Sequence, residues 1–151
     1  MPGEPKGTSS LSVFDKDSMA MDGFSIPLAR NAYNLEPNIY NEVTPQKRPL
    51  SSCTPTIILK DGLAEIIIGA SGGSQIVKSI FMSIAKFYRW GWPLLGVIRS
   101  PRSHNQLIPE VVYAEYGLPE WVSEGLKTKG HIVCRQSGGS VVQAIARTSV
   151  G

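Results

Sequence analysis

Residues 54–74 read TPTIILKDGLAEIIIGASGGS, and this stretch carries the strongest structural signal in the chain. Two apolar, β-branched runs, residues 54–60 and 63–70, flank Asp61-Gly62, a pair typical of a tight hairpin turn. The second run is apolar at consecutive positions, so we expect it to form a central strand that is covered on both faces. It ends in the glycine-rich residues 69–73, where the hydrophobic period changes.

A helix is predicted directly after these glycines, with Ser74 as its N-cap. Lys86 and Arg89 fall near its end, where positive charge suits the helix dipole. The apolar positions predicted to form one face of this helix are Ile76, Val77, Ile80, Phe81, Ile84, Phe87 and Tyr88.

The remaining predicted elements are shorter. Helices are expected at residues 94–99 and 120–127, and strands at residues 11–14, 111–113, 132–135 and 141–147. Residues 19–49 are rich in proline and asparagine, and so long a connection indicates either a functional loop or a missing packing partner. Strands followed by helices and then by strands favour an α+β fold class over a regularly alternating parallel fold.

Composition narrows the class of protein. The chain has 151 residues and a formal net charge of +3, which fits one globular domain. Its basic residues are scattered rather than gathered in a stripe, which disfavours a dedicated nucleic-acid binder. No signal peptide or membrane-spanning run is present in the sequence, so the compartment stays open. Cys53 and Cys134 are far apart and are expected as free thiols, with a single bridge as the alternative.

The segment Gly69-Ala70-Ser71-Gly72-Gly73 admits three interpretations. It matches the nucleophile elbow G-x-S-x-G, with Ser71 as the nucleophile of a serine hydrolase. It also fits a plain strand-to-helix turn in which glycine supplies a positive φ. Thirdly, its backbone N–H groups could bind an anion or a developing oxyanion. The elbow would need an acid and a base from a later set, which comprises Glu110, Glu115, Glu120, Glu124, His104 and His131.

Other polar segments could also carry chemistry. Ser51 and Ser52 precede the hairpin and could hydrogen-bond a carboxylate, or form an ordinary polar loop. Thr8 follows Gly7, and if the bond between them were cut, the freed α-amine could act as base for the threonine's own hydroxyl. Residues 101–106 group several polar side chains, although a lone histidine in such a segment is usually structural.

Taken together, these segments resemble the small, catalytic subunit of γ-glutamyltransferase, also called glutathione hydrolase, and fungal members most closely. Residues 7–13 are similar to the processing site, residues 47–56 to the serine-pair motif and residues 69–76 to the glycine pair of the oxyanion hole. Residues 101–107 and 142–148 complete the pattern. The resemblance covers residues 7–151, which a flexible tail at residues 1–6 is expected to precede.

The resemblance implies an N-terminal-nucleophile hydrolase fold, an αββα sandwich of which this chain would hold only the small-subunit half. A large subunit would be its partner, and glutathione or other γ-glutamyl compounds its substrates, with no metal or organic cofactor. Thr8 would be the nucleophile, Gly72 and Gly73 the oxyanion hole, and Ser51 and Ser52 the ligands of the substrate's α-carboxylate. Family members are usually secretory, vacuolar or membrane-anchored.

The sequence also departs from the family pattern. After Asp17 the family's threonine-rich hairpin is missing, which indicates an internal deletion, and the C-terminal end of the small subunit is missing too. Ala20 and Gly23 stand where family side chains hold the substrate's α-ammonium group. We therefore expect this chain by itself to be incomplete and inactive. The alternatives are a non-catalytic, light-chain-like binding protein and the serine hydrolase built on Ser71.

Overall fold

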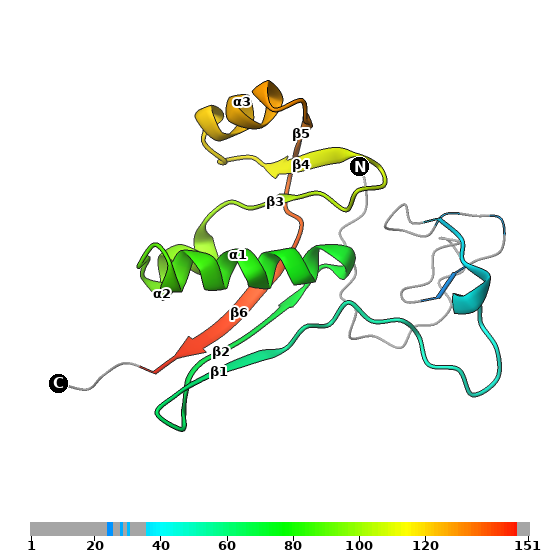
Figure 1. Ribbon diagram of the computed structural model, residues 1–151, viewed down its shortest axis with the longest axis horizontal. Coiled ribbons are helices and arrows are strands. Elements are labelled where there is room, and N and C mark those ends of the chain that lie inside the picture. Colours follow the sequence, from blue (N-terminus) through cyan, green and yellow to red (C-terminus); the bar gives the residue numbers. More distant parts are fainter. Residues whose placement is uncertain (1–23, 26–27, 29, 31–35, 148–151) are drawn as a thin grey trace.

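The computed structural model describes residues 24–25, 28, 30 and 36–147. Its larger sheet has the strand order β1-β2-β6, formed by β1 (Thr56–Lys60), β2 (Leu63–Ser71) and β6 (Val141–Ala146) (Figure 1). Both strand pairs are antiparallel, and Asp61 and Gly62 turn the chain with φ values of 53° and 76°. The predicted hairpin and the central place of β2 are therefore confirmed. The strand predicted at residues 11–14 lies outside the described residues.

Helix α1 (Ile76–Tyr88) covers one face of this sheet. Its core contacts join Ile76 and Ile80 to Ile68 of β2 and Val142 of β6, all of which are at most 4% exposed. The side chains of α1 that are buried are those of Ile76, Ser79, Ile80, Ser83 and Lys86. The predicted helix is confirmed, but part of its predicted face is wrong.

The error in the helix face concerns Val77, Phe81 and Tyr88, which are 52%, 65% and 43% exposed. Small serines occupy the buried face instead. Ser79 donates a hydrogen bond to the Gln75 carbonyl oxygen, 2.8 Å away, and its hydroxyl lies 2.5 Å from that of Ser140. Serine is short enough to let the helix approach the sheet closely, and the hydrogen bonds offset the burial of its hydroxyl.

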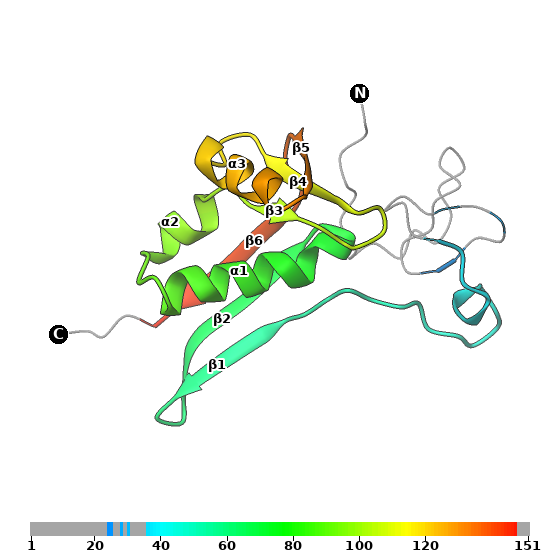
Figure 2. The same cartoon turned by 45° about the horizontal axis from the view of Figure 1, so that its top comes forward.

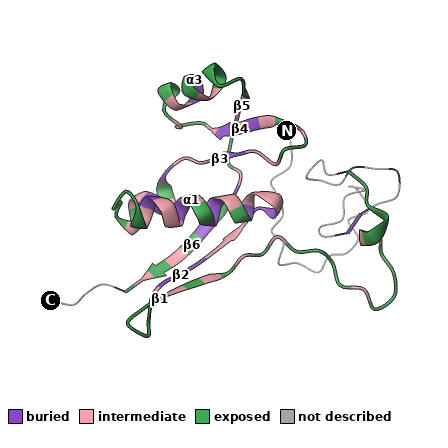
Figure 3. Ribbon diagram, in the orientation of Figure 1, coloured by how far each residue is buried: buried purple, intermediate pink, exposed green. Residues whose placement is uncertain are grey.

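In the part of the chain that the structure describes, the opposite face of the larger sheet is uncovered, which corrects the expectation that β2 is covered on both faces. Ile67 is 46% exposed, whereas its neighbours Ile66 and Ile68 are at most 2% exposed. Ile57, Ile67 and Ile145 lie side by side across β1, β2 and β6, and all three are exposed. Figure 3 shows exposed stretches along β1 and β6. The apolar pattern of β2 is thus typical of a strand that is buried on both faces, but the described residues cover only one of them.

A second sheet has the order β3-β4-β5 and lies on the other side of α1 (Figure 2). It consists of β3 (Ser103–His104), β4 (Val111–Glu115) and β5 (Ile132–Gln136), with α3 (Glu120–Thr128) connecting the parallel pair β4 and β5. The short helix α2 (Leu94–Arg99) leads from α1 into this sheet. The α+β prediction is confirmed, and β3 is the described strand that the sequence patterns did not predict.

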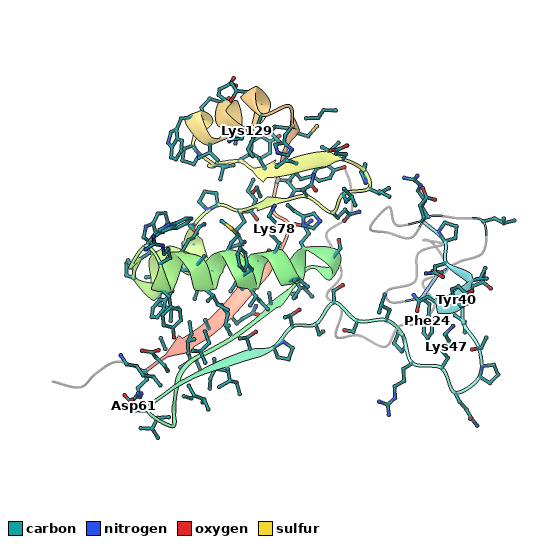
Figure 4. All side chains as sticks on the ribbon, in the orientation of Figure 1. Phe24, Tyr40, Lys47, Asp61, Lys78 and Lys129 are labelled. Atoms are coloured by element: carbon teal, nitrogen blue, oxygen red, sulfur yellow. The ribbon has the colours of Figure 1, made fainter. Side chains whose placement is uncertain are left out.

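The described part of residues 24–55 holds little regular structure. Ser25 and Glu42 form an isolated bridge, and a 3-10 turn, η1 (Ile39–Asn41), begins after Asn38, whose side chain accepts a hydrogen bond from the Tyr40 amide. In Figure 4, Phe24 and Tyr40 lie in this outlying segment, away from both sheets.

Ser79→Ala is expected to lower the free energy of unfolding by about 1–2 kcal/mol, because it removes a buried hydrogen-bond partner of Ser140. Urea denaturation of the two chains measures this difference. Glu124→Ala is the control: this side chain is exposed on α3, and loss of its solvent-screened ion pair with Lys127 should leave the free energy of unfolding nearly unchanged. An equal loss in both variants would contradict the assigned contact.

Candidate functional site

Several candidate residues meet at one end of the larger sheet. β2 leaves the sheet at Ser71, which pairs with Val141, the first residue of β6. Because β1 is antiparallel to β2, its first residue, Thr56, pairs with Ile68 near the same end. The segment that carries Ser51 and Ser52 therefore enters the sheet where the glycine-rich turn leaves it.

The turn itself is formed by Gly72 and Gly73, whose φ values are 133° and 56°. Both are buried, and a Cβ added at Gly72 would lie 2.7 Å from the Gly139 carbonyl oxygen. A side chain is therefore excluded at this position by both conformation and space. Positive φ values at consecutive residues, followed by a helix, are the geometry in which backbone N–H groups form a concave anion site.

The turn is supported by Ser140, the residue that precedes β6. The Ser140 hydroxyl contacts Ser79 of α1, and its carbonyl oxygen accepts a hydrogen bond of 2.7 Å from Nη2 of Arg102. Arg102 in turn donates to the Ile98 carbonyl at 3.0 Å and lies 3.7 Å from the Glu115 carboxylate. This arginine therefore joins α2, β4 and the start of β6 behind the turn.

A second support comes from the segment that follows β3. Ser74, the residue after Gly73, donates a hydrogen bond of 2.9 Å to Oε1 of Gln106. The same oxygen lies 3.1 Å from Nε2 of His104. Ser74 lies inside the 3-10 turn η2 (Gly73–Gln75), so its prediction as the N-cap of α1 is wrong. Its hydroxyl bonds another segment of the chain instead.

The serine pair lies in an irregular segment. Ser51 is exposed, and its hydroxyl accepts a hydrogen bond of 3.1 Å from the Cys53 amide. Ser52 is half-buried, and its carbonyl accepts one of 3.0 Å from the Thr54 hydroxyl. Thr8, Ala20 and Gly23 lie outside the described residues, so the structure does not place the nucleophile beside these serines.

The structure does not bring a catalytic triad together around Ser71. His104 is bound to Gln106, and His131 is exposed at the end of α3. Among the candidate acids, Glu115 bonds the Arg102 amide, Glu120 bonds Arg135 and Glu124 bonds Lys127. Among the described residues, therefore, no acid–histidine–serine chain supports the elbow interpretation.

The contacts of two basic residues, Lys86 and Arg102, were not predicted from the sequence. Lys86 is 7% exposed, and its ammonium donates to Ser100 at 2.6 Å and to the Pro101 carbonyl at 3.1 Å. Burial, followed by repulsion from Arg102, lowers the pKa of Lys86. In the sequence, Lys86 was assigned only to the end of its helix, where its charge suits the dipole, and Arg102 only to a polar segment. The pair Gly138-Gly139 before β6 was the available signal that a segment packs closely against the glycine turn.

The stability of the chain is expected to fall as the pH drops below about 6.5, with His104 as one cause. Burial lowers the pKa of His104, and nearby Lys78, which in Figure 4 lies between α1 and the second sheet, lowers it further. The unfolded chain therefore binds a proton more readily than the folded chain. Melting curves at pH 7 and 5 should show a smaller loss for His104→Gln, which keeps a donor for Gln106; an unchanged loss would contradict the assignment.

Three further properties concern the described residues. Cys53 and Cys134 are both free, as expected, and both are exposed. No cluster of three or more acidic, histidine or cysteine side chains that could hold a metal ion occurs in the part of the chain that the structure describes. In the same part, no helix combines the length and the apolar character needed to cross a bilayer.

The fold matches that of solved enzymes. The structure aligns over all of its length with 82% of the Helicobacter pylori γ-glutamyltranspeptidase T380A chain, at a TM-score of 0.78 and 28% identity. It aligns over 85% of its length with 69% of the Pseudomonas nitroreducens γ-glutamyltranspeptidase chain complexed with L-DON, at a TM-score of 0.75 and 32% identity. The chain therefore has the mixed α/β fold of an N-terminal-nucleophile hydrolase, in part.

The family follows from the sequence comparisons. The γ-glutamyltranspeptidase family model matches residues 4–151. Glutathione hydrolase proenzyme 1 of Schizosaccharomyces pombe is 38% identical over 95% of this chain and 28% of its own length, and the Escherichia coli glutathione hydrolase proenzyme is 33% identical over 83% and 22%. This chain belongs to the γ-glutamyltranspeptidase family. It spans about a quarter of the length of these curated relatives.

Proposed function

We propose that this chain is the catalytic half of a glutathione hydrolase, an enzyme that cleaves the γ-glutamyl amide bond of glutathione and related compounds. The observation that carries the proposal is the buried Gly72-Gly73 turn at the end of β2. It has positive φ at both residues and leads into α1, and it lies at the same end of the sheet as the serine pair. Such a turn can direct backbone N–H groups at one oxygen atom.

In the proposed reaction, cleavage of the bond between Gly7 and Thr8 frees the α-amine of Thr8. This amine takes the proton of the Thr8 hydroxyl while the hydroxyl oxygen attacks the γ-carbonyl carbon of the substrate. The N–H groups of Gly72 and Gly73 stabilise the resulting oxyanion. The amide C–N bond then breaks, the proton passes to the leaving amine, and water or an amino acid releases the γ-glutamyl group from Thr8.

Substrate binding is assigned to the serine pair. Ser51 and Ser52 carry hydroxyl donors on an open segment, and a hydroxyl pair suits the two oxygens of an α-carboxylate. Lys47 and Arg48 precede them on the same segment and add positive charge that favours an anionic ligand.

We further propose a large subunit as the partner of the uncovered sheet face. Ile57, Ile67 and Ile145 are 61%, 46% and 72% exposed, and the strand register places them in one row across the sheet. A row of this kind is typical of a sheet that packs face to face against a second sheet, about 10 Å away. That arrangement would complete the αββα sandwich.

By itself the chain is proposed to be inactive, because it lacks the large subunit that would complete the fold and share in substrate binding. Ala20 and Gly23 offer no side chain that could pair with the α-ammonium group of the substrate, so the complex is expected to bind its substrate weakly. A charged group left without partners in a closed site binds poorly. The two alternatives, a binding protein and a Ser71 hydrolase, are favoured by no specific contact among the described residues.

The native transcript is first sequenced from upstream of Met1 through the codons for Asp17 and Ser18, to obtain the region that encodes the large subunit. Hydrolysis of γ-glutamyl-p-nitroanilide is then compared between the chain alone and the chain coexpressed with that large subunit. We expect no release of nitroaniline by the chain alone and measurable release by the complex. Activity of the isolated chain would contradict the inactive assignment. A complex that forms but stays inactive would contradict the proposed function.

A further inference from the structure

We propose that Gln106 is a positioning residue for the Gly72-Gly73 turn, acting through Ser74. Its carboxamide joins Ser74 to His104 and so fixes the outer side of the turn on the second sheet. The proposed role in catalysis rests on the function proposed above, whereas the mechanical role does not. Gln106 follows β3 and is therefore distant in sequence from the turn.

The orientation of the Gln106 amide follows from its contacts. Its Nε2 donates a hydrogen bond of 3.1 Å to the Ile108 carbonyl oxygen. Oε1 is thereby directed at Ser74 and His104, which lie at 2.9 and 3.1 Å. An amide oxygen has two lone pairs, so it can accept both hydrogen bonds at once. The Ser74 hydroxyl and the His104 ring are therefore both donors.

The His104 end of this chain of contacts is rigid. His104 is 6% exposed and pairs with Tyr113 in the β3–β4 ladder. Because Nε2 faces an acceptor, it carries the ring proton, and Nδ1 is left buried without a hydrogen bond among the described residues. A ring fixed in one tautomer gives Gln106 a fixed donor to bind, so the position of Oε1 is set by the second sheet.

The turn thus has supports on both of its sides. On one side Gly72 lies against Gly139 and Ser140, at distances that leave no room for a Cβ atom. On the other side Ser74 is held through its own short side chain and Gln106. Since Gly73 lies between these supports, loss of the second one leaves Gly73 free to change its backbone angles. An N–H group that stabilises an oxyanion must keep its position to within about 0.5 Å and its direction to within about 20°. Movement of the Gly73 backbone would therefore lower the reaction rate.

The reporter for the turn is the Gln75 amide, which donates a hydrogen bond of 3.1 Å to the Gly72 carbonyl. Hydrogen exchange at this amide, measured by NMR on the full 151-residue chain, follows opening of the turn. Gln106→Met keeps the size of the side chain and removes both acceptor contacts. We expect hydrogen exchange at the Gln75 amide to be about tenfold faster than in the wild type, because a net loss of one hydrogen bond has about this effect. Ser74→Ala should act in the same direction and tests the contact should Gln106→Met fail to fold.

Matched variants separate positioning from general destabilisation. Gln106→Glu loses the donor to the Ile108 carbonyl but keeps an acceptor for Ser74 and His104. Exchange at Gln75 should therefore stay within about threefold of the wild-type rate, well below the roughly tenfold change expected for Gln106→Met. Glu124→Ala, on the exposed side of α3, should leave it unchanged. The proposal is overturned if Gln106→Met and Ser74→Ala exchange like the wild type, or if they accelerate Gln75 and the Ile80 amide of α1 equally.

Catalysis gives an independent measurement in the complex with the large subunit. Gln106→Met should lower kcat about tenfold and leave KM within about twofold, because the turn acts on the transition state rather than on substrate binding. A rise in KM with unchanged kcat would overturn the catalytic part. If the wild-type complex does not cleave γ-glutamyl-p-nitroanilide, the proposed function fails, while the exchange rates still decide the positioning role.

Discussion

Thr8→Ala is expected to reduce γ-glutamyl-p-nitroanilide hydrolysis by the assembled enzyme by at least about 10³-fold. The substitution removes the only oxygen that could form the γ-glutamyl ester in the proposed reaction. The remaining oxyanion donors and binding contacts would still act on the substrate, but without a nucleophile they support only slow attack by water. The effect should appear in kcat, with KM changed little.

The matched variant is Thr8→Ser, which keeps the hydroxyl and the adjacent α-amine. It should retain activity within about 10²-fold of the wild type, since the nucleophile and its base both remain. Mass spectrometry of the products should show a chain that begins at Thr8 in the wild type, whereas the bond that follows Gly7 should stay uncut in the Thr8→Ala variant. Equal activity of Thr8→Ala and the wild type would exclude Thr8 as the nucleophile and reopen the assignment of Ser71.

Gly72→Ala is expected to cost about 3 kcal/mol of unfolding free energy, from strain at positive φ and from overpacking. Gly72 has φ 133°, and the added methyl group would lie 2.7 Å from the Gly139 carbonyl oxygen and 2.9 Å from Cα of Ser140. Both neighbours are backbone atoms, so no flexible side chain can move aside. The turn must change shape, and the oxyanion donors change direction with it.

Activity of the assembled Gly72→Ala enzyme should therefore fall by about 10²-fold or more, the loss typical of removing one oxyanion donor. Gly125→Ala is the control for stability. Gly125 lies in α3 with no atom within 4 Å of an added Cβ, so alanine should stabilise the chain by about 0.5–1 kcal/mol. Chemical denaturation and the nitroanilide assay measure the two effects. Full stability in Gly72→Ala would contradict the described packing of the turn against Ser140.

Patterns within one element predicted the elements themselves well. Asp61-Gly62 between two β-branched runs identified the hairpin, and the change of period after Gly73 identified the start of α1 within a few residues. These signals are local, because turn conformation and side-chain periodicity depend on residues close in sequence. The family assignment was also available from the sequence, since it rests on several short motifs in a fixed order.

Predictions that depended on neighbours far along the chain were less accurate. Val77 and Phe81 were assigned to the core face of α1, yet the structure buries Ser79 and Ser83. Hydrophobicity alone could not show that a serine hydroxyl would find Ser140, a residue 61 positions away. The same holds for Ser74, which has the right type for an N-cap but bonds Gln106 in another part of the chain.

By itself, the sequence determined the hairpin, the glycine turn, the α+β class and the family, because these follow from local conformational preference and from motif order. Only the tertiary structure decided which residues support the turn. Ser140 precedes β6 in one sheet, whereas Arg102 and Gln106 flank β3 in the other, and their hydrogen bonds exist because the fold brings these distant segments together. Tertiary structure also showed that the described residues leave the second face of β2 uncovered, since burial is a property of the assembled layers and not of the strand.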